Sequence, residues 1–113
     1  MWIGPNSNPI ARIRRRIGRL ADGWFVLCKP EGFSAVQEDI HCEAEAVGRN
    51  PHDIGTEAGV AVVGPREAEW RDRVISWRRA GLSHLCLRTL GGGLDAHGHL
   101  ERMQQAYAEL PTD

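Results

Sequence analysis

The chain has 113 residues and a mass of 12.5 kDa, which is the size of one domain. A complete eight-stranded βα barrel takes roughly 250 residues, so this chain is too short to form one by itself. Hydrophobic residues make up 42% and charged residues 26% of the sequence, which is typical of a folded globular protein and excludes a disordered one. The formal net charge of −1 gives no general reason to expect nucleic acid or an anionic membrane as a partner.

Neither a membrane span nor a secretory signal is expected. No apolar run approaches the roughly 18 residues that a membrane helix needs, and five arginines interrupt the first 21 residues where the apolar core of a signal would lie. That basic, acid-free start also fits a mitochondrial transit peptide, but its helix and strand signals favour a folded segment. The three cysteines are odd in number and lack C-x-x-C spacing, so we expect a reduced, cytoplasmic chain.

The first predicted strand is the short apolar segment 1–4, and a turn follows it. Asn8 is expected to cap a helix whose first position is Pro9, because proline needs no hydrogen-bond donor there. The predicted inner stripe of this helix consists of Ile10, Ile13, Ile17 and Leu20. After Asp22-Gly23 ends the helix, residues 24–27 form a predicted strand that is fully buried.

A second βα unit follows the loop 29–32. Phe33, Val36, Ile40, Ala44 and Val47 recur at helical spacing, and Gly48 closes this helix. The next strand is predicted over 59–63 and is apolar on both faces. Burial on both sides is typical of a parallel sheet that helices cover.

The third helix opens at Gly64-Pro65 and ends before Gly81, with Trp70, Val74 and Trp77 as its core positions. Residues 82–87 form the fourth predicted strand, and the glycine-rich turn 89–93 follows it. Asp95 is expected to cap the last helix, whose predicted inner face consists of Leu100, Met103, Tyr107 and Leu110.

The predicted fold is therefore α/β, with four βα units in one domain spanning residues 1–113. Right-handed crossovers would make the four strands parallel and would bring every strand-to-helix loop to one end of the sheet. Ligands bind at that end in α/β proteins.

Two of these loops are candidate anion sites. Gly4-Pro5-Asn6-Ser7-Asn8 leads into the first helix, whose free N–H groups and dipole favour a phosphate. Thr89 to Gly93 contains three glycines that let the backbone approach a ligand closely. Neither loop matches a Walker or dinucleotide fingerprint, so the simpler interpretation is that they only build turns and caps.

The five arginines between 12 and 19 raise the alternative of a nucleic-acid patch. They spread around the predicted helix without neighbouring exposed aromatic residues, so a solvated outer face is favoured. The acidic residues of the second helix are expected to pair with them, namely Glu38, Asp39, Glu43 and Glu45.

The sequence predicts no metal site and no nucleophilic catalytic set. His97 and His99 diverge on a helix, as do His41 and Cys42, and His84 is interpreted as a core residue of the fourth strand. No G-x-S-x-G occurs, and no cysteine has an evident histidine partner.

Two stretches resemble the bacterial-luciferase-like monooxygenase family, which includes oxidoreductases that use the deazaflavin coenzyme F-420. The first is Trp2-Ile3-Gly4, a serine-containing turn, an arginine-rich helix and the run from Arg19 through Leu-Ala-Asp-Gly-Trp to Phe25. The second runs from Gly81-Leu82-Ser83-His84-Leu85 through Thr89-Leu90-Gly91-Gly92-Gly93-Leu94 to His99-Leu100 and is similar to the closing strand and helix of one subgroup. The resemblance covers roughly residues 2 to 109.

Family members are βα barrels of about 300 residues or more, so the resemblance implies the C-terminal third of such a protein, a partial (half) TIM barrel. It also implies a flavin cofactor, coenzyme F-420 or FMN, whose phosphate side is held by Gly4, Pro5, Asn6 and Ser7. The region between Ser7 and Asp22 is a few residues longer than the family pattern. The family's earlier strands, which carry most coenzyme contacts and the residues acting on substrate, have no counterpart in these 113 residues.

Four strands leave two open sheet edges and an apolar inner face. We therefore expect an oligomer, formed by self-association or by pairing with a separate N-terminal chain, and no activity from these residues alone. Met1 falls inside the family's strand, which indicates a truncated gene or a late start. The alternative function is a non-catalytic binding or assembly module that kept the fold and lost the reaction.

Overall fold

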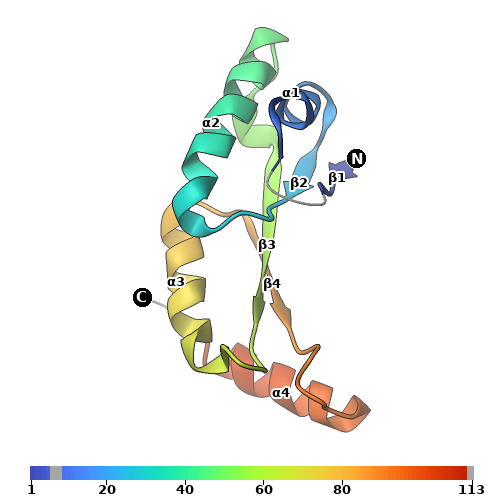
Figure 1. Cartoon of the computed structure of the whole chain (residues 1–113), viewed down its shortest axis with the longest axis vertical. Coiled ribbons are helices and arrows are strands. Elements are labelled where there is room, and N and C mark those ends of the chain that lie inside the picture. The colour runs from blue at the N-terminus through green and yellow to red at the C-terminus, as the bar shows by residue number, and fades with distance from the viewer. Residues whose placement is uncertain (6–8, 112–113) are drawn as a thin grey trace.

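The structure is a computed structural model that describes residues 1–5 and 9–111 (Figure 1). Strands and helices alternate along this part of the chain: β1 (Trp2–Ile3), α1 (Ala11–Leu20), β2 (Gly23–Phe25), α2 (Pro30–Ala46), β3 (Gly55–Ala61), α3 (Trp70–Ala80), β4 (His84–Arg88) and α4 (Ala96–Ala108). Two short 3-10 helices, η1 (Pro51–Asp53) and η2 (Glu67–Glu69), precede β3 and α3. The predicted alternation of strand and helix is confirmed.

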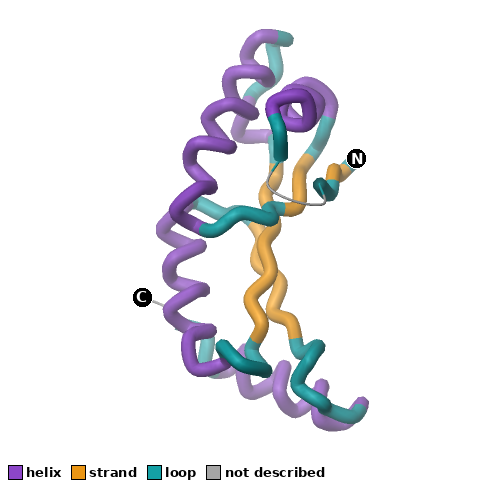
Figure 2. The backbone as a smooth tube through the Cα atoms, in the orientation of Figure 1, coloured by secondary structure: helices purple, strands orange, loops and turns teal. Residues whose placement is uncertain are grey.

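The sheet has the order β1-β2-β3-β4, and every neighbouring pair is parallel, as predicted (Figure 2). The strands are strongly staggered. β2 pairs with the first part of β3, residues 55–57, whereas β4 pairs with residues 57–61. The second half of β3 therefore has a strand neighbour on the β4 side alone among the described residues. Before β4 begins, side chains extend the pairing: Thr56 N–H donates to Ser83 Oγ at 2.7 Å, and Ser83 N–H donates to Thr56 Oγ1 at 2.9 Å.

The core lies between the sheet and the helices α2 and α3, which stand on one side of the strands (Figure 1). In β3 the side chains of Thr56, Ala58 and Val60 are buried on this side, whereas Glu57 on the other side is half-buried. The prediction of a strand over 59–63 with both faces buried is thus wrong. The strand begins four residues earlier and is fully buried on one face. The residues that alternate with its buried side chains are Gly55, Glu57, Gly59 and Ala61, which are half-buried.

β2 shows the same one-sided burial. Trp24 and Val26 are buried, but Phe25 and Leu27 are exposed, so the prediction of a fully buried strand over 24–27 is wrong. The physical reason is the period of two in a strand: neighbouring side chains point to opposite faces, and helices cover one of them. Trp24 therefore belongs to the core, where its ring stacks on Phe33 at 6.0 Å between centroids.

α1 begins later than its sequence signals indicate. Ile10 is the residue before the helix, and Ala11 is its first residue, so the predicted start at Pro9 is wrong. Asn8, its predicted cap, lies outside the described residues. Ile17 is buried and Ile13 half-buried, but Ile10 and Leu20 at the two ends of the predicted stripe are exposed, because α1 contacts the core mainly at its centre.

The expected pairing between α1 and the acidic α2 is confirmed for Asp39 and Glu43, two of the four acidic residues named for it. Arg14 Nη1 lies 2.5 Å from Asp39 Oδ2, and Arg19 Nε lies 2.8 Å from Glu43 Oε2. The two helices approach closely at Gly18, whose backbone lies against the carbonyl of Ile40. Charge and the small residue together hold α1 against α2.

Of the two middle helices, α2 follows its sequence signals closely, but the start of the third helix predicted at Gly64-Pro65 is wrong, because α3 begins at Trp70 after the 3-10 helix η2. α2 begins at Pro30, inside the predicted loop, because proline is favoured in the first turn of a helix. α3 ends at Gly81, which has a φ of 91° and provides the left-handed cap that its position predicts. Trp70 and Trp77 are buried core residues, as expected. None of the helices in the described part of the chain is long and apolar enough to cross a membrane.

α4 has its predicted cap but the opposite orientation. The side chain of Asp95 accepts a hydrogen bond from Gly98 N–H at 2.7 Å, which confirms the cap. The predicted inner face is wrong at three of its four residues, because Leu100, Met103 and Tyr107 are exposed and Ala106 is the buried residue of this helix. The fourth, Leu110, packs against the core just after the helix ends. Arg102 explains the orientation, since its Nε donates to Val62 O at 2.9 Å and its guanidinium lies over the ring of Trp70.

Replacing Gly18 by alanine should destabilise the chain. A Cβ at this position would lie 2.5 Å from Ile40 O and 2.7 Å from Glu43 Cβ, so α1 would have to move away from α2. We expect a net loss of about 1–3 kcal/mol in the free energy of unfolding, although alanine itself is the better helix former. Urea denaturation followed by circular dichroism measures the loss.

The matched control is Gly32→Ala in the first turn of α2, where a Cβ meets nothing within 4 Å. This variant should be unchanged or stabilised by up to about 1 kcal/mol. Equal stabilities of Gly18→Ala and Gly32→Ala would show that the close helix contact is not required.

Candidate functional site

The face of the sheet that the helices leave uncovered is called here the open face. It carries these side chains and glycines: Trp2, Gly23, Phe25, Leu27, Gly55, Glu57, Gly59, Ala61, His84, Cys86 and Arg88. Its first row is Trp2, Gly23 and Gly55, which the strand register places side by side. The indole of Trp2 lies flat across both glycines, since a Cβ at either would come within 2.6 to 2.8 Å of the ring. The absence of a side chain at the two glycines therefore leaves the space that the indole of Trp2 occupies.

The second row holds Phe25, Glu57 and His84, which are aligned by the same register. The indole of Trp2 touches two of them, with centroid distances of 5.6 Å to Phe25 and 5.5 Å to His84. The Nδ1 atom of His84 lies 2.8 Å from Ser83 Oγ. An aromatic floor with one imidazole and one carboxylate therefore occupies the middle of the open face.

Arg88 dominates the end of the open face toward the C-termini of the strands. Its side chain packs over Gly59, where a Cβ would lie 2.6 Å from Arg88 Nε. Glycine is therefore needed at this position for the arginine to lie flat on the sheet. Beside it is a shallow groove of about 160 Å³ along the part of β3 that β2 does not reach. The groove is lined by Phe25, Val26, Leu27, Glu57, Ala58, Gly59, Cys86 and Arg88. It offers a cation, a carboxylate and a thiol beside apolar walls.

The first predicted anion loop is described in part. Gly4 is exposed and Pro5 half-buried, while Asn6, Ser7 and Asn8 lie outside the described residues. The start of α1 is open to an anion in two respects: Ile10 offers no side-chain oxygen as a cap, and the first turn contains no acidic residue. The N–H groups of this turn and the helix dipole therefore favour negative charge here.

The second predicted loop, Thr89 to Gly93, is a poorer anion site. Thr89 is buried and its Oγ1 lies 2.8 Å from Nδ1 of His99, so its hydroxyl has a partner within the fold. Gly91 and Gly93 have φ values of 88° and 73°, which explains why glycine is required at both positions. Asp95 already places a carboxylate at the start of α4, and this charge would repel a phosphate bound there.

The histidines are scattered over the molecule. His84 is exposed on the open face, so its interpretation as a core residue is wrong. His97 lies 3.0 Å from Glu101 on the outside of α4. The rings of His41 and His52 meet at 5.9 Å, and burial lowers the pKa of His41, with the neighbouring His52 acting in the same direction. Within residues 1–5 and 9–111 no group of three or more His, Cys, Asp or Glu side chains is placed to hold a metal ion.

Sequence reasoning missed Glu57, Cys86 and Arg88 as members of a site. The signal was present in β4, where the sequence His-Leu-Cys-Leu-Arg alternates polar and apolar residues with a period of two. That pattern predicts one polar and one apolar face, and the structure confirms it: Leu85 and Leu87 lie on the helix side of the sheet. Glu57 lies before the predicted strand 59–63, in the part of β3 that the sequence pattern does not indicate.

The three cysteines are free, and their reactivity should report which side of the sheet is accessible. Cys86 is exposed on the open face, whereas burial raises the pKa of the half-buried Cys28. The raised pKa means that a smaller fraction of Cys28 is thiolate at pH 8 than of an unperturbed cysteine, and its side chain is also less accessible. Cys86 should therefore react with a chromogenic disulfide reagent at least about tenfold faster than Cys28. The comparison uses two double substitutions that each leave one cysteine. Cys28→Ser with Cys42→Ser leaves Cys86, and Cys42→Ser with Cys86→Ser leaves Cys28.

The control repeats both reactions in denaturant, where the difference should disappear. Equal rates in the native state would show that the open face around Cys86 is not accessible in solution.

Comparison with known proteins adds no relative, since no protein-family model matches the chain and no curated protein matches it at the significance required.

Proposed function

We propose that this chain is a segment of a luciferase-like, flavin- or deazaflavin-dependent oxidoreductase of the monooxygenase type. In this proposal its four βα units form half of a TIM barrel, and the start of α1 contributes to the site for the cofactor's phosphate. The observation that carries the proposal is the sheet itself: four parallel strands lie in chain order, and the helices cover one face.

The arrangement of the sheet supports a barrel segment over an open doubly wound sheet. In doubly wound folds the strand order reverses at a switch point and helices cover both faces. Here the order follows the chain without reversal, and the open face lacks a helix in the described part. The stagger of β3 between β2 and β4 also fits, because a barrel requires a staggered register to close.

The start of α1 supports a phosphate site at the positions that the family resemblance implies. Gly4 and Pro5 follow β1 directly, and the helix that begins at Ala11 has no acidic residue in its first turn. A phosphate held there gains from several N–H donors and from the helix dipole. When bound, FMN or coenzyme F-420 supplies the hydride chemistry, and the protein binds and orients it.

The open face supplies the side chains that would lie nearest such a cofactor. Phe25 and Leu27 give apolar walls at the end of β2, and Arg88 gives a positive charge at the end of β4. Glu57 and Cys86 lie between them. In this proposal these residues position the bound cofactor and exclude water from one side of it.

The phosphate part of the proposal predicts that FMN binds more tightly than riboflavin, which lacks the phosphate. Fluorescence titration of the purified chain measures both affinities, and we expect a difference of about tenfold because the interactions at the helix start are charge-assisted. Ala11→Asp places a carboxylate in the first turn, where it should remove most of this preference while slightly stabilising the helix.

Ala35→Asp is the matched control, since it adds the same charge at an exposed position of α2. It should leave the preference for FMN unchanged. Failure of FMN and coenzyme F-420 to bind the chain, alone or together with an N-terminal partner chain, would reject the proposal, and equal effects of the two aspartates would reject the phosphate site at α1.

One observation favours a second candidate, a non-catalytic assembly module. Three large apolar side chains of α4 point to solvent, namely Leu100, Met103 and Tyr107, although the sequence pattern of the helix would bury them. A chain that binds no flavin-type cofactor but associates through this helix would fit the module and exclude the oxidoreductase.

A further inference from the structure

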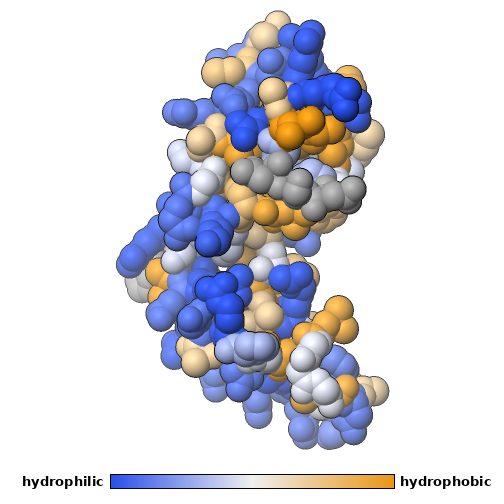
Figure 3. Space-filling view, in the orientation of Figure 1, coloured by the Kyte–Doolittle hydropathy of each residue, from blue (hydrophilic) through white to orange (hydrophobic). Residues whose placement is uncertain are grey.

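The outer side of α4 carries an apolar surface that no other described part of the chain covers. Leu100, Met103 and Tyr107 follow one another at helical spacing and are 62%, 47% and 77% exposed. Met103 and Tyr107 also border a groove of about 360 Å³ that is completed by Leu87 of β4 and Gln104. These five residues are called here the α4 stripe. Figure 3 shows further apolar residues over the segment that joins β4 to α4, outside the α4 stripe.

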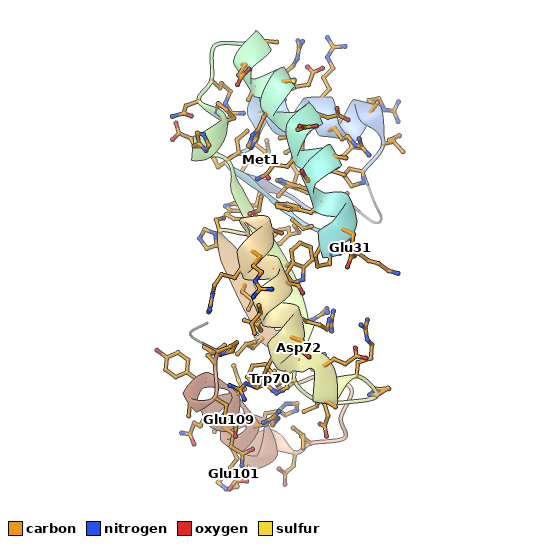
Figure 4. The ribbon with its side chains drawn as sticks, turned by 90° about the vertical axis from the view of Figure 1, so that its left-hand side faces the viewer. Met1, Glu31, Trp70, Asp72, Glu101 and Glu109 are labelled. Atoms are coloured by element: carbon orange, nitrogen blue, oxygen red, sulfur yellow. The ribbon has the colours of Figure 1, made fainter. Side chains whose placement is uncertain are left out.

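The helix cannot turn this stripe inward without losing its contacts on the other side. Arg102 donates to Val62 O, and its guanidinium lies 5.8 Å from the ring centroid of Trp70, which sits where α3 meets α4 (Figure 4). His99 contacts Thr89 at 2.8 Å, and Ala106 is fully buried. Polar and small residues thus fix α4 to the fold, and its large apolar residues are left outside.

The chain exposes more surface than a compact protein of its mass. A compact protein of 12.5 kDa exposes about 6,200 Å² and a chain of this length has a radius of gyration of about 13 Å. This chain exposes 7,200 Å² and has a radius of gyration of 15.6 Å. The excess of about 1,000 Å² belongs to the whole chain, so it includes the open face as well as the α4 stripe.

We propose that the α4 stripe is the contact surface of a two-fold dimer of this chain. A two-fold axis brings the same patch of both copies together, so the patch must be complementary to itself. The α4 stripe meets this condition, because Tyr107 projects beside the groove that a copy of Tyr107 would fill, and Gln104 can hydrogen-bond its hydroxyl. This proposal is independent of the cofactor proposed above.

Charge favours the α4 stripe over the open face as the contact surface between two copies. No member of the α4 stripe is charged at neutral pH, so two stripes meet without repulsion or buried ions. The open face, by contrast, carries Glu57 and Arg88, whose charges would lose water in a face-to-face contact. The net charge of −1 also leaves little repulsion between whole copies.

Sedimentation equilibrium of the full chain over a range of concentrations tests the proposal. The chain should reach a mass of twice 12.5 kDa. Met103→Glu and Tyr107→Glu should each weaken the dimer at least about thirtyfold, because each buries a charge at the centre of the contact. Both positions are exposed in the single chain, so the circular dichroism and the urea midpoint of the monomer should not change.

Leu90→Glu is the matched control, since Leu90 is 77% exposed in the loop after β4 and lies outside the stripe. Its dimer should have unchanged affinity. A chain that remains monomeric at every concentration would overturn the proposal. So would a dimer that survives both glutamate variants of α4 and is lost with Phe25→Glu, because the open face would then be the interface. FMN titration of Tyr107→Glu separates the two proposals, since the monomer should keep its cofactor affinity.

Discussion

The structure depends on an aromatic cluster that joins three elements of the chain. Trp24 of β2 stacks on Phe33 of α2, and Phe33 meets Trp77 of α3 edge-to-face at 5.6 Å. All three side chains are buried, and such pairs contribute beyond the apolar area that they remove from water. The cluster holds the helix layer against one face of the sheet, and this one-sided packing determines what the other face can do.

Because helices pack on one face of the sheet, alternate side chains along each strand are either buried in the core or exposed on the open face. The helix side takes Ala58, Val60 and the leucines of β4, while the opposite side receives Glu57, Cys86 and Arg88. Glycines let the large side chains of the open face lie flat on the sheet, as Trp2 does on Gly23 and Arg88 on Gly59. The open face and the α4 stripe lie on different sides of β4, so the proposed cofactor site and the proposed dimer contact share no residues.

The reliable parts of the sequence analysis are those with a local physical cause. Gly81 ends α3 because a left-handed residue is needed there, and Asp95 caps α4 with its own side chain. The error at the start of α1 is also local. The Asn8-Pro9 pair predicts a helix that starts at Pro9, whereas α1 begins two residues later at Ala11. The loop residues Gly4 and Pro5 were identifiable from their place after a strand, and their role as a site stays a prediction.

The sequence by itself determined the succession of strands and helices, the parallel sheet and the aromatic core, because helix caps, apolar spacing and crossover handedness act over short stretches of chain. Only the tertiary structure decided which face of each element meets water. The outward turn of Leu100, Met103 and Tyr107 depends on Arg102, which bonds to a carbonyl 40 residues away. The open face likewise depends on a register between strands that are distant in sequence. Periodicity reveals that a helix or strand has two sides, but contacts between distant residues choose which side is buried.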